Sequence, residues 1–434
     1  MISRKHTDIL LIAVFAFVFA IIFPGKSAAL PQFARRYNLK CSACHTIVPV
    51  LNEQGELFQR LGYHLPPALQ PSHAVSKLSE LHQGADWSLT NNASLAVTDF
   101  SYSAERTTQE GQTPSSTSAF QVGSWNAYFA GWIPDTNFFY HAEFDIVTGG
   151  STNPDLSNAC IGYGGGTAKN SWYVIGGREH LQVAQGTRAA QVYSLLLSPP
   201  LLFENASPTN FVVDQSPVGV SAGYTWISDS YRRVFAASAK ITNGDNADGS
   251  EILTSSNRNS KDAWVDLDFW YAPESGITFI DYYGKKDQNN TDALGNAFTF
   301  HPVIRRQGIF ANYMYKNTVD LTGGYLRSHD DWLSAQNAPA GSFVGNDYFV
   351  GLDYYIRQGF AVSGRFDRLN QQITGVGGVG KQNTHDWTVG VNKTFTQAGN
   401  IIGRIAYSKL SGRDPVAAVK STDRLVQADI SVNF

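Results

Sequence analysis

Strict alternation of apolar and polar side chains is the feature that most restricts the fold of this chain. At the C-terminal end, five apolar residues alternate with four polar ones: Val426, Ala428, Ile430, Val432 and Phe434 against Gln427, Asp429, Ser431 and Asn433. The same period recurs over 348–356 and 264–271. Because successive side chains of a β-strand point to opposite faces, each segment predicts a strand with one apolar and one polar face.

The lengths of the connections separate a membrane barrel from a soluble sandwich. Short turns are predicted at 134–137, 228–230, 273–276, 316–318, 357–359 and 397–400. Long polar loops are predicted at 105–118, 150–170, 243–261, 287–304, 328–345, 370–384 and 410–422. Outer-membrane barrels alternate short periplasmic turns with long outer loops, whereas a sandwich gives no reason for this pattern. We therefore predict an all-β fold, a transmembrane antiparallel β-barrel.

Counting the strands between these joins predicts a barrel of about sixteen. The joins alone define fifteen strands, but an antiparallel ring needs an even number. We place the missing strand within Leu181–Leu197, because the strands on either side of that region would otherwise run the same way. Eight loops and seven turns follow, with both ends of the barrel at the periplasmic rim.

Composition agrees with this fold and excludes several others. The 434 residues include only 16% charged side chains and three cysteines, and the net charge is −3. A coiled coil, a collagen, a disulfide scaffold and a multi-span helical protein are excluded, and no nucleic-acid partner is expected. Instead of two or three globular domains, we predict a signal peptide at 1–29, a haem segment at 30–86 and a barrel at 87–434.

The N-terminus has the order of regions found in an export signal. Basic Arg4 and Lys5 precede an apolar run, Ile9–Phe23, which is short for a membrane-spanning helix. Small residues at Ser27 and Ala29 then stand where a signal peptidase requires them, so cleavage is expected after Ala29. An uncleaved signal anchor is the alternative.

A haem attachment motif, C-x-x-C-H, follows the signal at residues 41–45. Two thiols at this spacing, Cys41 and Cys44, can bond the two vinyl groups of one haem, and His45 then binds the iron as proximal ligand. The alternatives are a redox C-x-x-C, which does not need the histidine, and half of a zinc site, which needs a second ligand pair. We predict one covalently bound haem c.

The distal iron ligand has two candidates. His64 is our first choice. It follows a predicted helix in which Leu51, Gln54, Leu57, Phe58 and Leu61 fall on one face at spacings of three and four residues. The alternative is that His64 is an ordinary surface histidine. Met314, predicted to face the lumen near the periplasmic mouth, is the second choice. A five-coordinate iron would instead favour ligand binding or peroxidase-like chemistry.

Alternation also predicts which charged side chains face the lumen: Asp266, Asp268, Asp353, Arg365, Asp367 and Arg404. Such charges commonly pair across a barrel, and a role in guiding ions is the alternative. Cys160, the third cysteine, is expected in an outer loop, with no assigned role. No catalytic triad, phosphate loop or carboxylate pair supports a hydrolase or kinase.

The haem segment resembles a known family. The matching residues are Phe33, Ala34, Tyr37, the motif at 41–45, Pro49, Leu51, Asn52, Gly55, Phe58, Gly62 and Tyr63. They resemble the haem segment of fused outer-membrane cytochrome–porins, the monohaem iron oxidases of iron-oxidising bacteria. The resemblance implies a small α-helical c-type cytochrome segment in which Cys41, Cys44 and His45 hold the haem. It also implies extracellular Fe(II) as electron donor and periplasmic cytochromes as acceptors.

Three functions follow from this organisation. The first is an outer-membrane electron conduit that oxidises extracellular Fe(II), an iron:cytochrome c oxidoreductase, with residues 30–86 inserted in the lumen. The second is a diffusion porin whose haem segment is a tether or sensor. The third is a conduit that sends electrons outward to extracellular metals, because the direction depends on redox potentials. In each case the expected location is the bacterial outer membrane, with the N-terminus periplasmic and lipid around the barrel.

Overall fold

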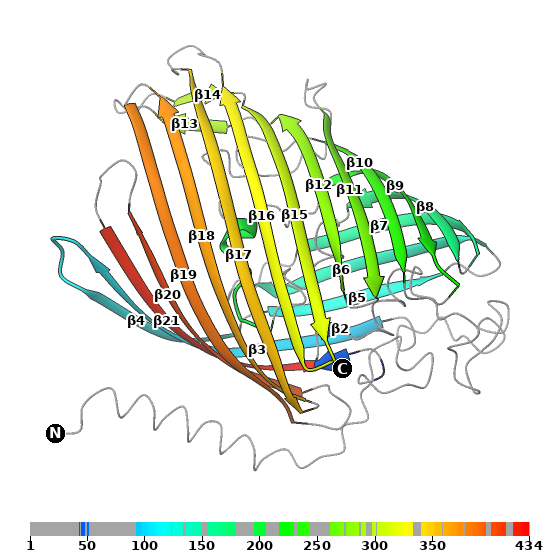
Figure 1. Ribbon diagram of the computed structural model, residues 1–434, viewed down its shortest axis with the longest axis horizontal. Coiled ribbons are helices and arrows are strands. Elements are labelled where there is room, and N and C mark those ends of the chain that lie inside the picture. Colours follow the sequence, from blue (N-terminus) through cyan, green and yellow to red (C-terminus); the bar gives the residue numbers. More distant parts are fainter. Residues whose placement is uncertain are drawn as a thin grey trace.

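A closed ring of antiparallel strands makes up most of the computed structural model (Figure 1). The predicted transmembrane β-barrel is thus confirmed. The residues that the structure describes are 43, 45–47, 50–51, 93–122, 124–132, 136–148, 155–167, 169–178, 195–204, 217–229, 233–243, 261–272, 275–285, 288–291, 297–300, 302–332, 340–357, 359–375, 378–395, 401–413 and 420–433.

Seventeen labelled strands of this described part form the ring. They are β3 (Ala93–Gln109), β4 (Ser115–Val122), β5 (Ser124–Trp132), β6 (Phe138–Thr148), β7 (Asp155–Gly166), β8 (Asn170–Arg178), β9 (Val218–Ile227), β10 (Val234–Asn243), β11 (Lys261–Ala272), β12 (Ser275–Lys285), β15 (Val303–Tyr315), β16 (Val319–Trp332), β17 (Gly341–Arg357), β18 (Phe360–Gly375), β19 (Gly378–Thr394), β20 (Ile401–Arg413) and β21 (Lys420–Asn433). Two small hairpins lie outside the ring: β1 (His45–Ile47) with β2 (Val50–Leu51), and β13 (Gln288–Thr291) with β14 (Ala297–Phe300). Within the described residues, no helix is both long and apolar enough to cross a membrane.

β4 and β5 are two parts of one membrane-spanning strand. Only position 123 separates them, and both pair with β3 in a single register, Phe100 with Val122 and Val97 with Trp125. The described strands therefore cross the wall sixteen times, which confirms the predicted number. β21 pairs with β3 and closes the ring, so both ends of the barrel lie at the same rim.

The two rims differ in the lengths of their connections. One rim has seven short turns: 133–137, 167–169, 228–233, 273–274, 316–318, 358–359 and 395–400. The other rim has eight connections of more varied length: 110–114, 149–154, 179–217, 244–260, 286–302, 333–340, 376–377 and 414–419. The predicted division into turns and loops is confirmed. The prediction of a long loop at 370–384 is wrong, however, because β18 and β19 extend to a two-residue connection at 376–377.

Two details of the predicted strand order are wrong. The missing strand is β7, which lies inside the loop predicted at 150–170, and Cys160 is therefore a strand residue. β8 and β9 are hydrogen-bonded neighbours, so no strand from Leu181–Leu197 lies between them. Glycine conceals the alternation of β7 because it places no side chain on either face, and aromatic rings fill the space beside Gly162 and Gly165. A Cβ on Gly162 would stand 2.1 Å from the ring of Phe139.

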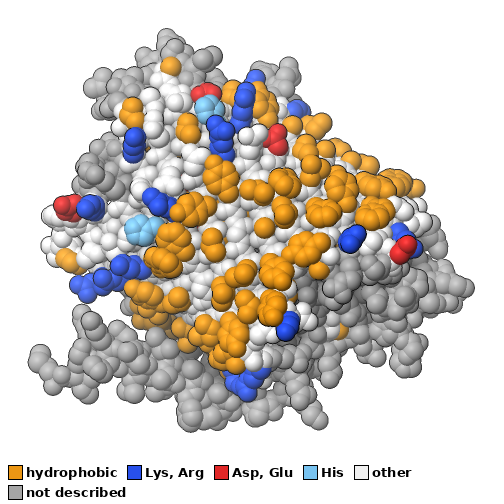
Figure 2. All heavy atoms as spheres, in the orientation of Figure 1, with side chains coloured by type: hydrophobic (Ala, Val, Ile, Leu, Met, Phe, Trp, Pro, Cys, Tyr) orange, Lys and Arg blue, Asp and Glu red, His pale blue; other side chains and the backbone are white. Residues whose placement is uncertain are grey.

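The barrel has an apolar outer surface and a more polar inner one. On β11, Leu267 and Phe269 are 42% and 51% exposed, whereas Asp266 between Val265 and Leu267 is 4% exposed. Figure 2 shows the resulting band of hydrophobic side chains across the outside of the wall. Because exposed apolar area of this extent is unfavourable in water, the band defines the surface that contacts lipid.

This assignment predicts a depth-dependent cost for charge on the outer face of β11. Leu267→Arg, near the middle of the strand, should lower the free energy of unfolding by about 2–4 kcal/mol. Tyr271→Arg, at the end next to the short turn, should cost about 0–1 kcal/mol because its guanidinium reaches the interface. Denaturant titration of the protein in lipid vesicles measures both values, and equal costs would contradict the assignment of the lipid-facing band.

Candidate functional site

A segment of the longest connection, residues 195–204, folds into the lumen. Leu195, Leu196, Leu202 and Phe203 are all buried, and Leu201–Glu204 forms the single turn of α6. α6 contacts β17 and β18, and Figure 1 shows it within the ring of strands. The inserted segment, as we name residues 195–204, therefore narrows the space enclosed by the barrel.

A buried ion pair on β18 holds the inserted segment against the wall. Arg365 and Asp367 are two residues apart, so both point inward, and their Nε and Oδ2 atoms are 2.6 Å apart. The Arg365 guanidinium donates to the carbonyl oxygens of Ser198 and Pro199, each at 2.7 Å. Asp367 Oδ1 accepts the backbone N–H of Leu201 at 3.0 Å. The pair thus satisfies backbone groups that the turn leaves without partners.

Apolar packing provides the second attachment. The Phe203 ring stacks on Phe310 at 5.4 Å between centroids and lies 6.2 Å from Phe349. These rings belong to a buried apolar cluster on the inner wall: Leu202, Phe203, Trp264, Ile280, Tyr282, Ile304, Phe310, Leu326, Phe349 and Leu369. Part of the lumen wall is therefore packed like the interior of a soluble protein.

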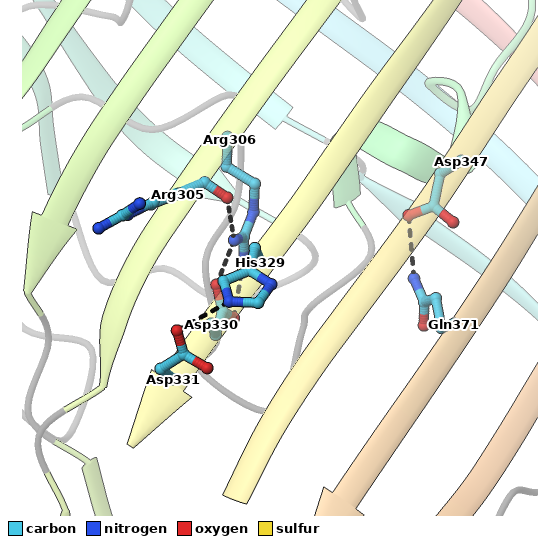
Figure 3. A network of polar contacts seen from close by, with 7 residues as sticks. All are labelled: Arg305, Arg306, His329, Asp330, Asp331, Asp347 and Gln371. Carbon is cyan, nitrogen blue, oxygen red and sulfur yellow. Dashed lines mark hydrogen bonds and ion pairs between the residues drawn. The ribbon is translucent and has the colours of Figure 1, made fainter. Parts of the chain in front are cut away.

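Other inward charges bind either an opposite charge or a neutral polar side chain. Figure 3 shows Arg306 and Asp330 facing each other from β15 and β16, both almost completely buried. Arg306 Nη2 donates to Asp330 Oδ2 at 3.0 Å, a second bond joins Nη1 to Oδ1, and Gln371 donates to Asp347 at 3.2 Å. His329 and Asp331 pair separately on the outer side, at 2.7 Å. The Arg306–Asp330 pair is neutral as a unit, whereas Asp347 is satisfied by a neutral amide.

The inward orientation predicted for six charged residues is confirmed. Arg365 and Asp367 bind the inserted segment, and Arg404 binds Asp429 with Nε–Oδ1 at 2.9 Å. The other three are Asp266, which accepts from Ser238, Asp268, which accepts from Thr278, and Asp353, which lies between outward Leu352 and Tyr354. Of the two roles weighed for these charges, pairing accounts for Arg365, Asp367 and Arg404.

Met314 also faces inward, next to the short turn at 316–318. Its side chain is 9% exposed and packs with Leu195, Tyr355 and Ala361. Its backbone N–H donates to Ser275 Oγ at 2.9 Å. The inserted segment therefore covers the thioether through Leu195. A role for Met314 as distal haem ligand stays a prediction, and it would require Leu195 to move.

The predicted haem site lies mostly outside the described residues. Cys41, Cys44 and His64 are not among them, and neither are the residues after Leu51 in the predicted helix. For His45 only the backbone is described, as the first residue of β1, paired with Leu51 of β2. In the described part of the chain, no group of three or more histidine, cysteine or acidic residues is arranged to hold a metal ion.

The inserted segment was not predicted, although a signal for it exists. Residues 195–203 include a mainly apolar run interrupted by Pro199 and Pro200, inside a connection of the barrel. Two prolines oppose a strand, and apolar side chains at a rim must be buried somewhere. The lumen is the nearest space that can bury them, so this pattern indicates an inward fold.

Comparison with known proteins supports the fold. Neither a family model nor a curated protein sequence matches the chain. Among solved structures, the loop L8 deletion mutant of OmpT, an outer membrane protein of Vibrio cholerae, is similar at 10% identity with a TM-score of 0.50. The match covers 79% of this chain and all of that one. Outer-membrane expressed OmpT matches at 11% identity and the same TM-score, over 78% and 97% of the two chains. The chain thus has the fold of outer-membrane β-barrels.

The inserted segment should be released when its ion pair is broken. Arg365→Ala leaves the Asp367 carboxylate buried without its partner, which should lower the free energy of unfolding by about 3–5 kcal/mol. We expect the single-channel conductance in planar bilayers to rise, because the segment no longer narrows the lumen.

The matched control is Arg404→Ala, which breaks the buried pair with Asp429 and does not touch the inserted segment. It should destabilise the barrel while leaving the conductance at the wild-type value. An unchanged conductance in Arg365→Ala, or an equal rise in both variants, would contradict the role assigned to the Arg365–Asp367 pair.

Proposed function

We propose that this protein is an outer-membrane electron conduit that carries one covalently bound haem c. It oxidises extracellular Fe(II) and passes the electrons to a periplasmic cytochrome c or a similar carrier. One observation carries the proposal: a complete C-x-x-C-H motif, preceded by a predicted export signal, stands in the same chain as a transmembrane barrel. A soluble carrier cannot cross the outer membrane, whereas a redox group attached to a barrel can be held within it.

The donor set fits the cofactor. Cys41 and Cys44 have the spacing needed for two thioether bonds to one haem, and His45 is adjacent to serve as proximal ligand. When bound, the haem supplies reversible one-electron chemistry. His64 remains the first candidate for the distal position, and Met314 remains the second.

The barrel itself provides insulation and position. Its wall is closed, and the apolar band of such barrels is about 25 Å tall. Arg365 and Phe203 hold the inserted segment in place, and the segment narrows the lumen. We propose that the haem segment enters from the periplasmic rim and lies against this narrow region. Short turns are periplasmic in outer-membrane barrels, and both ends of this barrel lie at the short-turn rim. The N-terminal segment would accordingly start in the periplasm.

A diffusion porin is the second candidate, and the lumen wall favours it. Polar side chains on the inner face, such as Arg404 with Asp429 and Asp347 with Gln371, are typical of porin lumens. The haem segment would then be a tether or a sensor. A conduit that sends electrons outward to extracellular metals uses the same architecture, and the potentials of donor and acceptor decide between the two directions.

Purified protein exposed to Fe(II) without oxygen tests the proposal. The absorption bands of reduced haem c should appear when Fe(II) is added. Cys41→Ala and Cys44→Ala should each disrupt covalent haem attachment, detected by haem staining after denaturing electrophoresis.

Cys160→Ala is the matched control, because Cys160 lies in β7 within the barrel wall. It should retain both the haem stain and the reduction by Fe(II). If the wild-type protein binds haem but is not reduced by Fe(II) at any pH tested, Fe(II) is not the donor. If the wild-type protein binds no haem, the proposed electron conduit is wrong, and a diffusion porin becomes the best-supported function.

A further inference from the structure

A hollow of about 640 Å³ lies on the wall close to the rim with the longer connections. It is formed by β18, β19, β20 and β21, and its lining includes Phe366, Arg368, His385, Lys420 and Thr422. We name it the rim hollow. It is distinct from the lumen, the inserted segment and the haem motif.

The register of the strands shows that the rim hollow faces outward. Arg368 pairs with His385, His385 with Ser411, and Ser411 with Thr422, so these side chains share one face of the sheet. On β19 the same face carries Trp387, which is 57% exposed, whereas Asp386 on the opposite face is 4% exposed. The hollow therefore opens toward the surroundings of the barrel.

Positive charge is concentrated in and beside the rim hollow. Arg368 and Lys420 line it together with the His385 imidazole, and none of the three forms an ion pair within the described part of the chain. Asp367 and Asp386, on the same strands, point to the lumen. One acidic residue, Glu110, lies directly opposite Lys420 at the end of β3, and its backbone N–H donates to the Lys420 carbonyl oxygen at 3.0 Å.

A row of like charges continues from the rim hollow across the next strands. Lys409 pairs directly with Arg424, and Arg424 pairs directly with Arg106, on the outer face. Like charges placed directly opposite one another destabilise a sheet. An anion lying against this row would relieve the repulsion, so the surface is electrostatically suited to an anionic ligand.

An aromatic group lies on the membrane side of these charges. The rings of Phe366 and Trp387 are 4.5 Å apart between centroids, and Phe366 is 6.3 Å from Tyr348. Figure 2 shows that Lys and Arg side chains surround the hydrophobic band and are mostly absent from it. Cations at the rim with aromatic rings toward the membrane centre match a lipid that has anionic headgroup charges and acyl chains.

From this geometry we propose that the rim hollow binds the phosphate groups of lipid A, the membrane anchor of lipopolysaccharide. The inference rests on the proposed outer-membrane location, in which the rim with the longer connections faces outward. Lipopolysaccharide occupies that outer leaflet, and its phosphates lie at the boundary between sugar headgroup and acyl chains. Arg368 and Lys420 donate charge-assisted hydrogen bonds to a phosphate, and the acyl chains pack on Phe366 and Trp387.

Binding of bisphosphorylated lipid A to the full-length, haem-bearing protein tests the proposal. The triple variant Arg368→Gln, His385→Asn and Lys420→Gln should bind this lipid at least about ten-fold more weakly, since each surface cation contributes on the order of a few-fold to several-fold. Lipid A without phosphates should bind the wild-type protein as weakly as bisphosphorylated lipid A binds the triple variant. Heat-dependent migration in electrophoresis confirms that the variant barrel is folded.

Lys393→Gln is the matched control, because Lys393 lies on the same outer face of β19 at the opposite rim. It should bind lipid A like the wild type. Wild-type affinity in the triple variant, an equal loss in Lys393→Gln, or equally strong binding of phosphatidylglycerol would each overturn the proposal. Cys44→Ala should leave lipid A binding unchanged, so a failed haem proposal is distinguishable from a failed lipid site.

Discussion

Closure of the hydrogen-bonded ring is the constraint on which the rest of this structure depends. Within a bilayer no water is present to satisfy backbone N–H and C=O groups, so every strand needs a partner on both sides. β21 meets that need by pairing with β3, at the opposite end of the barrel sequence. Once the ring is closed, each strand must place alternate side chains in lipid and in the lumen. The outward Leu267 and the inward Asp266 are consequences of that single requirement.

The interior combines a packed core with a polar channel wall. Phe203 and Phe310 bury apolar surface as they would in a soluble domain, and the Arg365–Asp367 pair closes the hydrogen bonds of the segment beside them. Both attachments act on residues 195–204, so the inserted segment is held by two independent kinds of interaction. Around it, the Arg306–Asp330 and Arg404–Asp429 pairs neutralise four of the inward charges. A barrel organised in this way has less open space than its strand number alone would suggest. The charges of the rim hollow contrast with this interior, because they face outward and the structure shows no ion pair for Arg368, His385 or Lys420 among the described residues.

Alternation and connection length were sufficient to predict the barrel, its sixteen crossings and the inward charges, because each depends on a local period of two. The alternation of β7 could not be recognised from the sequence, because glycine occupies several of its positions. The ring of Phe139 fills the space beside Gly162, and residue type alone does not reveal that contact between strands. An antiparallel ring needs one strand more than the predicted joins define. That strand is β7, and not a segment of Leu181–Leu197. The inserted segment depends on Arg365, more than 150 residues from Ser198 in the sequence, and no local pattern contains that contact. The proposed attachment of haem rests on five consecutive residues, 41–45, whereas a distal ligand would depend on how distant segments meet.

An electron conduit of the proposed kind passes electrons, and not iron ions, across the membrane. Proteoliposomes made with the haem-bearing protein test it directly, with oxidised cytochrome c trapped inside one batch and a colour-forming Fe(II) chelator trapped inside another. Fe(II) is then added outside both batches without oxygen. For an electron conduit, we expect the trapped cytochrome c to be reduced while the chelator stays colourless. The contradicting result has two parts: the chelator vesicles become coloured, and cytochrome c is reduced no faster than in protein-free vesicles. That result would identify the protein as a diffusion channel and not an electron conduit.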